Sequence, residues 1–178
     1  MGKTFKKVAN IIFDEITPKL ENNDGLVIFV ENRAKFERWL QVELCGILSH
    51  HFPTVIPEKD KIDIVLEEKN DDVVNDWAIE LKTVNTSYKF KNFKNIENKT
   101  RPITQNIEGI IEDIKKLRST NYTNKAVLFV VFPVTHNYKE WKEIHLDKII
   151  RELNGNIIHK EFKFKNGVPG VIYFGLVT

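Results

Sequence analysis

The run Ala126–Phe132 constrains the fold more than any other feature of this sequence, because none of its side chains is polar. A strand of this kind, rich in Val and Phe, is typically buried on both faces. Apolar residues at helical spacing predict helices before and after it, over 102–117 and 138–153. We therefore expect an α/β or α+β fold in which a central mixed β-sheet is flanked by helices.

Further elements follow from shorter patterns along the chain. Apolar spacing predicts a helix over 5–20 and a longer one, capped by Asn32, from Arg33 to His51. Residues 26–30 are a brief apolar stretch, interpreted as a strand or a packed connection. Alternating apolar residues predict strands over 62–67, 77–84, 157–164 and 171–177.

Length and composition indicate one domain. The 178 residues show no repeat and no Pro/Gly/Ser-rich linker, so we expect a single domain, 1–178, with an N-terminal helical segment over about 1–22. The one cysteine, Cys45, excludes a disulfide framework within the chain. No apolar run is long enough for a signal peptide or a membrane span, so a cytoplasmic location is expected. Because 27 basic residues nearly balance 25 acidic ones, any nucleic-acid surface depends on local clusters of charge.

The residues most suited to chemistry lie in the hairpin predicted from 62–67 and 77–84. Side chains alternate along a strand, so Glu80 and Lys82 share one face, about 7 Å apart. Pairing of the two strands can bring Asp63 beside Glu80. Adjacent carboxylates repel each other unless a cation intervenes, and Mg²⁺ suits such oxygen ligands. These residues predict a metal site for Mg²⁺, with Mn²⁺ as an alternative; an ordinary charged surface hairpin is the competing interpretation.

This arrangement resembles the signature of the PD-(D/E)XK nuclease superfamily, which includes many restriction endonucleases: Asp63, a turn, then Glu80-Leu81-Lys82. The order of predicted elements is similar too, with a helix before the hairpin and a helix, a buried strand and a helix after it. The resemblance implies a restriction-endonuclease-like core in which Asp63 and Glu80 bind the metal and Lys82 assists the attacking water. Ile62 stands where the family name has proline, which is often absent in the superfamily.

A third carboxylate is expected from the helix before the hairpin. Glu43 falls on the apolar stripe of the predicted helix, where an isolated charge is costly. Superfamily members often place a helix glutamate at the edge of the metal site, and Glu43 is the candidate for that role. Glu37 is the weaker alternative, and a glutamate paired with a Lys or Arg at the edge of the core is the competing interpretation.

Residues 85–101 are interpreted as a long polar loop that follows the predicted catalytic strand. Lysines interleaved with aromatic residues suit phosphate contacts combined with base stacking. We expect this loop to contact DNA; a solvated loop in a chain rich in Lys and Asn is the alternative. The predicted contacts are Tyr88, Lys89, Lys91, Lys94 and Arg101, with Gln105 in the next helix, where some branches of the superfamily use a glutamine.

The predicted function is Mg²⁺-dependent hydrolysis of DNA phosphodiester bonds by an endonuclease, of which a type II restriction enzyme is one form. One site per chain and two antiparallel DNA strands suit a homodimer with two-fold symmetry. The alternative is an inactive nuclease fold that binds DNA or a protein within a larger complex. The sequence does not distinguish DNA from RNA as the substrate.

Overall fold

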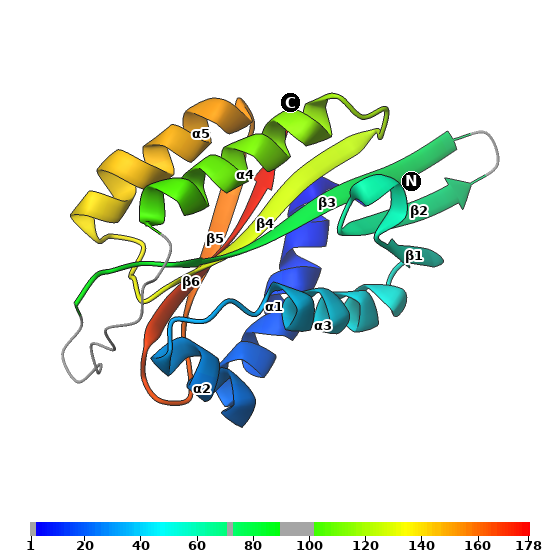
Figure 1. Cartoon of the computed structure of the whole chain (residues 1–178). Coiled ribbons are helices and arrows are strands. Elements are labelled where there is room, and N and C mark those ends of the chain that lie inside the picture. The colour runs from blue at the N-terminus through cyan, green and yellow to red at the C-terminus, as the bar shows by residue number, and fades with distance from the viewer. Residues whose placement is uncertain (1–2, 71–72, 90–101) are drawn as a thin grey trace.

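A mixed six-stranded sheet forms the centre of the computed structural model, which describes residues 3–70, 73–89 and 102–178. The strands are β1 (Thr54–Pro57), β2 (Ile64–Asn70), β3 (Val73–Asn85), β4 (Asn124–Phe132), β5 (Ile157–Lys163) and β6 (Pro169–Leu176). Their order in the sheet is β1-β2-β3-β4-β6-β5. Neighbours are antiparallel except β3 and β4, which run parallel. Helices lie on both faces (Figure 1), so the prediction of an α+β fold is confirmed.

The apolar run is the inner part of β4, which lies between β3 and β6. Residues 126–132 are all buried. Alternate side chains enter two separate cores: Leu128 and Val130 belong to one, and Val127 and Phe129 to the other. The prediction that this strand is buried on both faces is confirmed, and it places β4 at the boundary between the two cores.

Helices α1 (Phe5–Asn22) and α3 (Glu37–Ser49) cover one face of the sheet. Apolar residues at helical spacing bury one stripe of each helix, as Ile12 and Ile16 do in α1 and Leu40 and Leu44 do in α3. These side chains pack against Trp77, which points from β3 into the same core. The N-terminal helical segment is therefore part of the domain.

The other face is covered by α4 (Ile103–Arg118) and α5 (Asp147–Leu153). Ile107, Ile110 and Ile114 form the buried stripe of α4. A π-helical segment, η2 (Trp141–Leu146), precedes α5 and continues into it. The two predicted helices on this side are thus present, the second of them beginning with a wider turn.

The β2–β3 hairpin opens before β3 ends. The last pair of the ladder is Ile64 opposite Ile79. One step further, the same register places Asp63 opposite Glu80. Beyond that point β3 continues to Asn85 with β4 alone as its partner. The two strands therefore form a fork, and the continued register places Asp63 and Glu80, the predicted pair of carboxylate residues, opposite each other at its base.

The segment after α1 differs from the prediction. Residues 24–31 form a helix, α2 (Asp24–Glu31), where a strand or connection was expected. The Asn23 side chain caps this helix by accepting a hydrogen bond from the Leu26 N–H at 3.0 Å. Asn32 ends α2 and does not begin α3, because its N–H donates to the carbonyl of Ile28. The apolar residues of this segment suit a strand as well as a helix, and the side-chain cap favours the helix.

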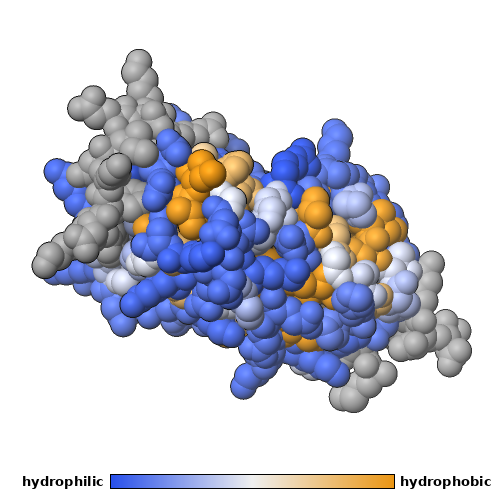
Figure 2. Space-filling view, turned by 90° about the horizontal axis from the view of Figure 1, so that it is seen from below, coloured by the Kyte–Doolittle hydropathy of each residue, from blue (hydrophilic) through white to orange (hydrophobic). Residues whose placement is uncertain are grey.

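No helix in the described residues is long and apolar enough to cross a membrane. Seen from below, the surface is largely hydrophilic, with separate apolar patches (Figure 2). The large apolar side chains exposed among the described residues are Ile28, Phe29, Val42, Ile144 and Ile150.

Candidate active site

Two carboxylates accept hydrogen bonds from backbone N–H groups of β3, at the edge of the strand where β2 no longer pairs with it. Oδ2 of Asp63 accepts a hydrogen bond from the Leu81 N–H at 2.7 Å, and Oε1 of Glu37 accepts one from the Thr83 N–H at 3.0 Å. Side chains thus satisfy backbone donors that a neighbouring strand would otherwise pair. Asp63 comes from the segment before β2 and Glu37 from the start of α3, so three parts of the chain meet at this edge of β3.

Glu80 is the most buried member of this group, with only 4% of the residue exposed. It points to the α4 side of the sheet, where Nζ of Lys116 lies 2.5 Å from its Oε1. The contact is an ion pair without a well-aligned hydrogen bond, so this buried oxygen is incompletely satisfied. Burial raises the pKa of Glu80 to about 8, against the opposing effect of Lys116 and with a further upward contribution from Asp63.

Lys82 shares the Glu80 face of β3 and is paired with a different residue. Its Nζ lies 2.8 Å from Oδ2 of Asp113 on α4. Burial alone would lower the pKa of Lys82, but Asp113, together with Glu37 and Asp63, outweighs burial and raises it. Lys82 is therefore a cation at neutral pH, which suits stabilisation of negative charge rather than removal of a proton.

A strained turn leads directly into Asp63. Glu58, Asp60 and Lys61 have φ angles of 56°, 54° and 63°, in the left-handed region that non-glycine residues rarely adopt. Such conformations persist only where surrounding contacts enforce them, and they cluster at functional sites. The strain is thus located two to five positions before the first predicted metal ligand.

Helix α3 supplies the contacts that hold this turn. Nε2 of Gln41 donates to the Asp63 carbonyl at 2.7 Å and to Oε1 of Glu58 at 2.8 Å. Arg38 pairs with the same Glu58 carboxylate. Gln41 is 7% exposed, so its amide is a buried link between α3 and the backbone of Asp63.

A pocket of about 130 Å³ opens at the fork. Liquid water occupies roughly 30 Å³ per molecule, so this volume suits a few waters or a small anion. The lining residues come from α3, the segment before β2, and β3: Glu37, Arg38, Gln41, Asp63, Leu81 and Lys82.

Glu43 does not lie in this site, so that assignment is corrected. Its Oε2 is 2.8 Å from Nζ of Lys19 on α1, and the two form a partly exposed ion pair. The periodicity of α3 placed Glu43 near the apolar stripe but did not show that α1 packs along that side. Glu37, the weaker alternative in the sequence, is the helix glutamate that reaches β3.

The predicted DNA contacts are only partly described. Lys89 is exposed, whereas Lys91, Lys94 and Arg101 lie outside the described residues. Tyr88 is 6% exposed and packs against Tyr138 with ring centroids 4.3 Å apart and ring planes tilted by 37°, so it is a packing residue and not a platform for bases. Gln105 lies on the exposed side of α4, and its buried neighbour Asn106 is the residue that faces β3.

The donor set fits a hard divalent cation. Asp63 and Glu80 offer carboxylate oxygens, and Oε1 of Glu80 is buried and incompletely satisfied. Among the described residues no three His, Cys, Asp or Glu side chains converge as a ready metal-binding group. Mg²⁺ commonly binds through one or two carboxylates, with water and substrate phosphate completing its coordination, so two carboxylates are a sufficient protein contribution.

Sequence reasoning missed the residues that α4 and α3 contribute. Asp113 and Lys116 of α4 lie one helical turn apart, beside the apolar stripe that was recognised. Their spacing shows that they share a face of the helix, but it does not show which strand that face contacts. Gln41 gave a clearer signal, because it is a polar residue on the buried side of its helix.

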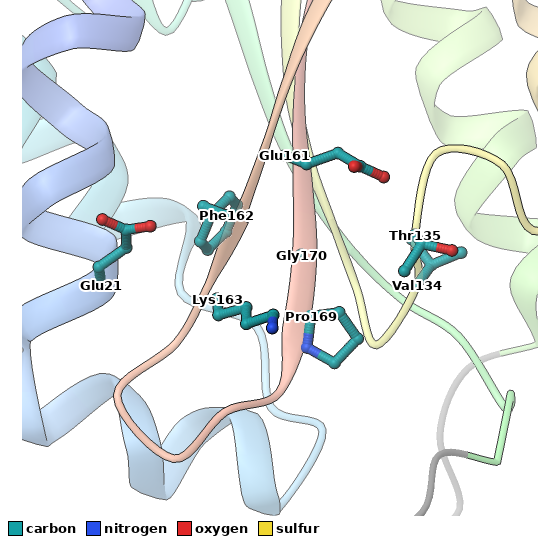
Figure 3. A pocket seen from close by; sticks show the side chains of 8 residues that line it. All are labelled: Glu21, Val134, Thr135, Glu161, Phe162, Lys163, Pro169 and Gly170. Carbon is teal, nitrogen blue, oxygen red and sulfur yellow. The ribbon is translucent and has the colours of Figure 1, made fainter.

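A larger hollow of about 330 Å³ lies at the opposite edge of the sheet (Figure 3). Its charged lining residues are Glu21 of α1 and Glu161 and Lys163 of β5. Glu161 already accepts a hydrogen bond from the N–H of His136. In the sheet, β4 lies between the strands of this pocket and β3 of the fork, and the pocket includes none of the predicted catalytic residues.

Comparisons with protein-family models, with curated proteins and with solved structures find no match to this chain. The restriction-endonuclease-like core and the superfamily assignment therefore stay predictions from the sequence.

Proposed function

We propose that this chain is a metal-dependent nuclease that hydrolyses phosphodiester bonds of DNA. The observation that carries the proposal is the fork between β2 and β3, where the register places Asp63 opposite Glu80. Lys82 lies two residues further along the face that Glu80 occupies. Asp63 and Lys82 line the small pocket at the fork, and Glu80 directly precedes Leu81, another of its lining residues. Two carboxylates and a cation beside an accessible pocket are components that suit metal-assisted phosphodiester hydrolysis.

Each residue has a distinct role in this proposal. Asp63 and Glu80 hold Mg²⁺ or Mn²⁺, which supplies Lewis-acid polarisation of the phosphate and a more acidic bound water. Lys82 stays protonated and stabilises the negative charge that develops on the phosphate oxygens. Glu37 fixes the edge of β3 through its hydrogen bond to the Thr83 N–H.

DNA as substrate, and a homodimer that cuts both strands, complete the proposal. One fork per chain and the antiparallel strands of a duplex suit two copies related by two-fold symmetry. The lysines of the segment after β3 contact the phosphates, and a type II restriction enzyme is one form such a protein takes.

The test is plasmid cleavage in Mg²⁺ by the wild-type protein and three variants, Asp63→Asn, Glu80→Gln and Lys82→Met. Each variant is expected to lose at least about 100-fold in cleavage rate, since each removes a group that acts on the reacting phosphate or its metal. Glu43→Gln is the matched control, because it changes a carboxylate paired with α1. Circular dichroism and thermal unfolding check that the variants are folded. Full activity of Glu80→Gln would refute the proposed mechanism.

One observation favours a second candidate, a nuclease fold that binds without cutting. Glu80 and Lys82 both have oppositely charged partners on α4, as a purely structural charge cluster would. This candidate predicts DNA or protein binding that does not depend on Mg²⁺ or on Asp63. Binding that is unchanged by EDTA, together with no cleavage in Mg²⁺ or Mn²⁺, would favour it over the nuclease.

A further inference from the structure

Helix α4 places two charged side chains against the charged face of β3. Lys116 contacts Glu80 at 2.5 Å and Asp113 contacts Lys82 at 2.8 Å. The contacts match in spacing, because residues three apart on a helix and two apart on a strand each share one face. Glu80 and Lys82, the two charged residues of this face of β3, thus each have an oppositely charged partner on α4.

Lys116 occupies a position between the two halves of the candidate metal site. Its Nζ contacts Oε1 of Glu80 on β3, and it also donates a hydrogen bond to the carbonyl of Lys61. Lys61 belongs to the strained turn that leads into Asp63. The ammonium therefore has one oxygen partner on β3 and another in the turn that leads into Asp63, so it lies between the segments that carry the two predicted metal ligands.

The two partners differ in their freedom to move. The Glu80 side chain is 4% exposed and lies on an inner strand of the sheet. The Lys116 side chain is 37% exposed, and a lysine can extend its ammonium into solvent while its alkyl stem stays packed. If a second cation approaches Glu80, Lys116 is the group that can leave.

We propose that Lys116 is a built-in counter-ion of Glu80, which a divalent metal must displace in order to bind. This inference rests on the proposed function and adds a form of regulation to the same site. Where Glu80 is ionised in the metal-free protein, the Lys116 ammonium at 2.5 Å offsets the cost of burying that charge. A metal ion bound to Glu80 would meet the Lys116 ammonium at close range in a partly desolvated site, where like charges repel strongly. Metal binding is thereby coupled to release of Lys116 from β3.

The experiment compares Lys116→Gln with Lys115→Gln, using the full chain. Lys115 lies next to Lys116 on α4 and is exposed, so its substitution removes the same charge without touching Glu80. Titration calorimetry with Mg²⁺ measures the dissociation constant of each protein. Lys116→Gln is expected to bind Mg²⁺ at least about tenfold more tightly than wild type, and Lys115→Gln within about twofold, since exposed charges are screened.

A second measurement uses the wild-type protein, so it does not depend on folding of the variant. Acetylation of each lysine by a water-soluble reagent is followed by mass spectrometry, with and without Mg²⁺. Labelling of Lys116 is expected to rise severalfold in Mg²⁺, because its ammonium leaves Glu80. In Asp63→Asn, where the metal is bound less well, Mg²⁺ should leave the labelling unchanged.

The possible results separate this inference from the proposed function. Two results would overturn displacement of Lys116 but leave the proposed metal site intact. One is equal Mg²⁺ affinity of the Lys116 and Lys115 variants. The other is Lys116 labelling that does not change when Mg²⁺ binds to the protein. Absence of Mg²⁺ and Mn²⁺ binding in all three proteins overturns the metal site itself.

Discussion

At the scale of single residues, burial and charge act against each other at Glu80. An acid with a pKa raised by burial binds its proton more tightly in the folded state than in the unfolded chain. The pKa of Glu80 rises from an ordinary value of 4.5 to about 8. Its contribution to stability is therefore complete below about pH 4.5 and is lost as the pH rises through about 8.

We predict that Glu80→Gln stabilises the metal-free protein in alkaline solution. Glutamine has the shape of the protonated acid and never acquires the buried charge. In EDTA the variant should exceed wild type by about 2–4 kcal/mol in unfolding free energy at pH 9 and match it near pH 4.5. Urea unfolding at both pH values measures the difference, with Glu43→Gln as the control. A gain that is the same at both pH values would show that burial of the charge is not its cause.

The residues of the fork illustrate what the sequence can predict. Alternation along a strand correctly put Glu80 and Lys82 on one face, and the shortness of the hairpin brought Asp63 opposite Glu80. Partners on distant elements were not predictable in this way. Lys19, which pairs with Glu43, is 24 residues away, and no local pattern links the two.

At the scale of elements, the opening of the hairpin creates the site. A carboxylate can cap a strand N–H only where the neighbouring strand has left, and this occurs one residue beyond the pair of Ile64 and Ile79. The strained turn before β2 then directs Asp63 toward the vacated edge of β3. Its position depends on the contacts that hold the turn, of which Gln41 is the most buried.

We predict that Gln41→Ala weakens the position of Asp63. The change removes three hydrogen bonds in a largely buried place: those that Nε2 donates to the Asp63 carbonyl and to Glu58, and the one that Oε1 accepts from Arg38. Stability is expected to fall by about 1–3 kcal/mol and the cleavage rate of the proposed nuclease by about tenfold. Thermal unfolding and plasmid cleavage measure the two effects. Val42→Ala, at a position 70% exposed on the same helix, is the control that should change neither.

Two elements that were not predicted, α2 and β1, are both too short to carry a distinctive pattern. α2 is short and strongly apolar, and its residues suit a strand as well as a helix; only the cap at Asn23 distinguishes the two. β1 has four residues and lies at the sheet edge, too short for alternation to reveal it. Longer elements were found because many residues carry one signal: a helical period of apolar residues in α4, and an unbroken apolar run in β4.

At the scale of the whole molecule, charge is nearly balanced, with a net value of +2. The DNA binding that we propose must then depend on a local group of lysines rather than on the overall field. The segment after β3 supplies that group by sequence: Lys89 is exposed, and Lys91 and Lys94 follow it outside the described residues.

We predict that changing Lys89, Lys91 and Lys94 together to Gln weakens DNA binding and reduces its dependence on salt. Each phosphate contact contributes about 0.9 to the slope of log K against log salt, so loss of three contacts lowers the slope by up to about 3. Fluorescence anisotropy with a labelled duplex at several salt concentrations measures it. A slope equal to that of the wild type would remove these lysines from the interface.

A control with the same change of charge comes from exposed lysines elsewhere on the surface: Lys6, Lys7 and Lys163. Two of them lie on α1 and the third on β5, on elements that contribute nothing to the fork. Their combined substitution by Gln should leave the slope close to the wild-type value.

The order of the strands in the sheet could not be predicted from the sequence. A mixed sheet between helical layers followed from the buried run of β4 and the order of predicted helices and strands around it. The parallel pairing of β3 with β4 and the place of β6 between β4 and β5 depend on contacts between distant segments. These contacts bring α4 across β3, and α4 in turn supplies Asp113 and Lys116 to the site.

The central claim is that Asp63 and Glu80 together hold a divalent metal at the fork. Anomalous diffraction from crystals grown with Mn²⁺ tests it most directly, because Mn²⁺ replaces Mg²⁺ at oxygen sites and its position is located without prior assumption. We expect one Mn²⁺ within about 2.0–2.3 Å of a carboxylate oxygen of each residue. Crystals with Mn²⁺ absent from the fork, and Lys116 still against Glu80, would contradict it.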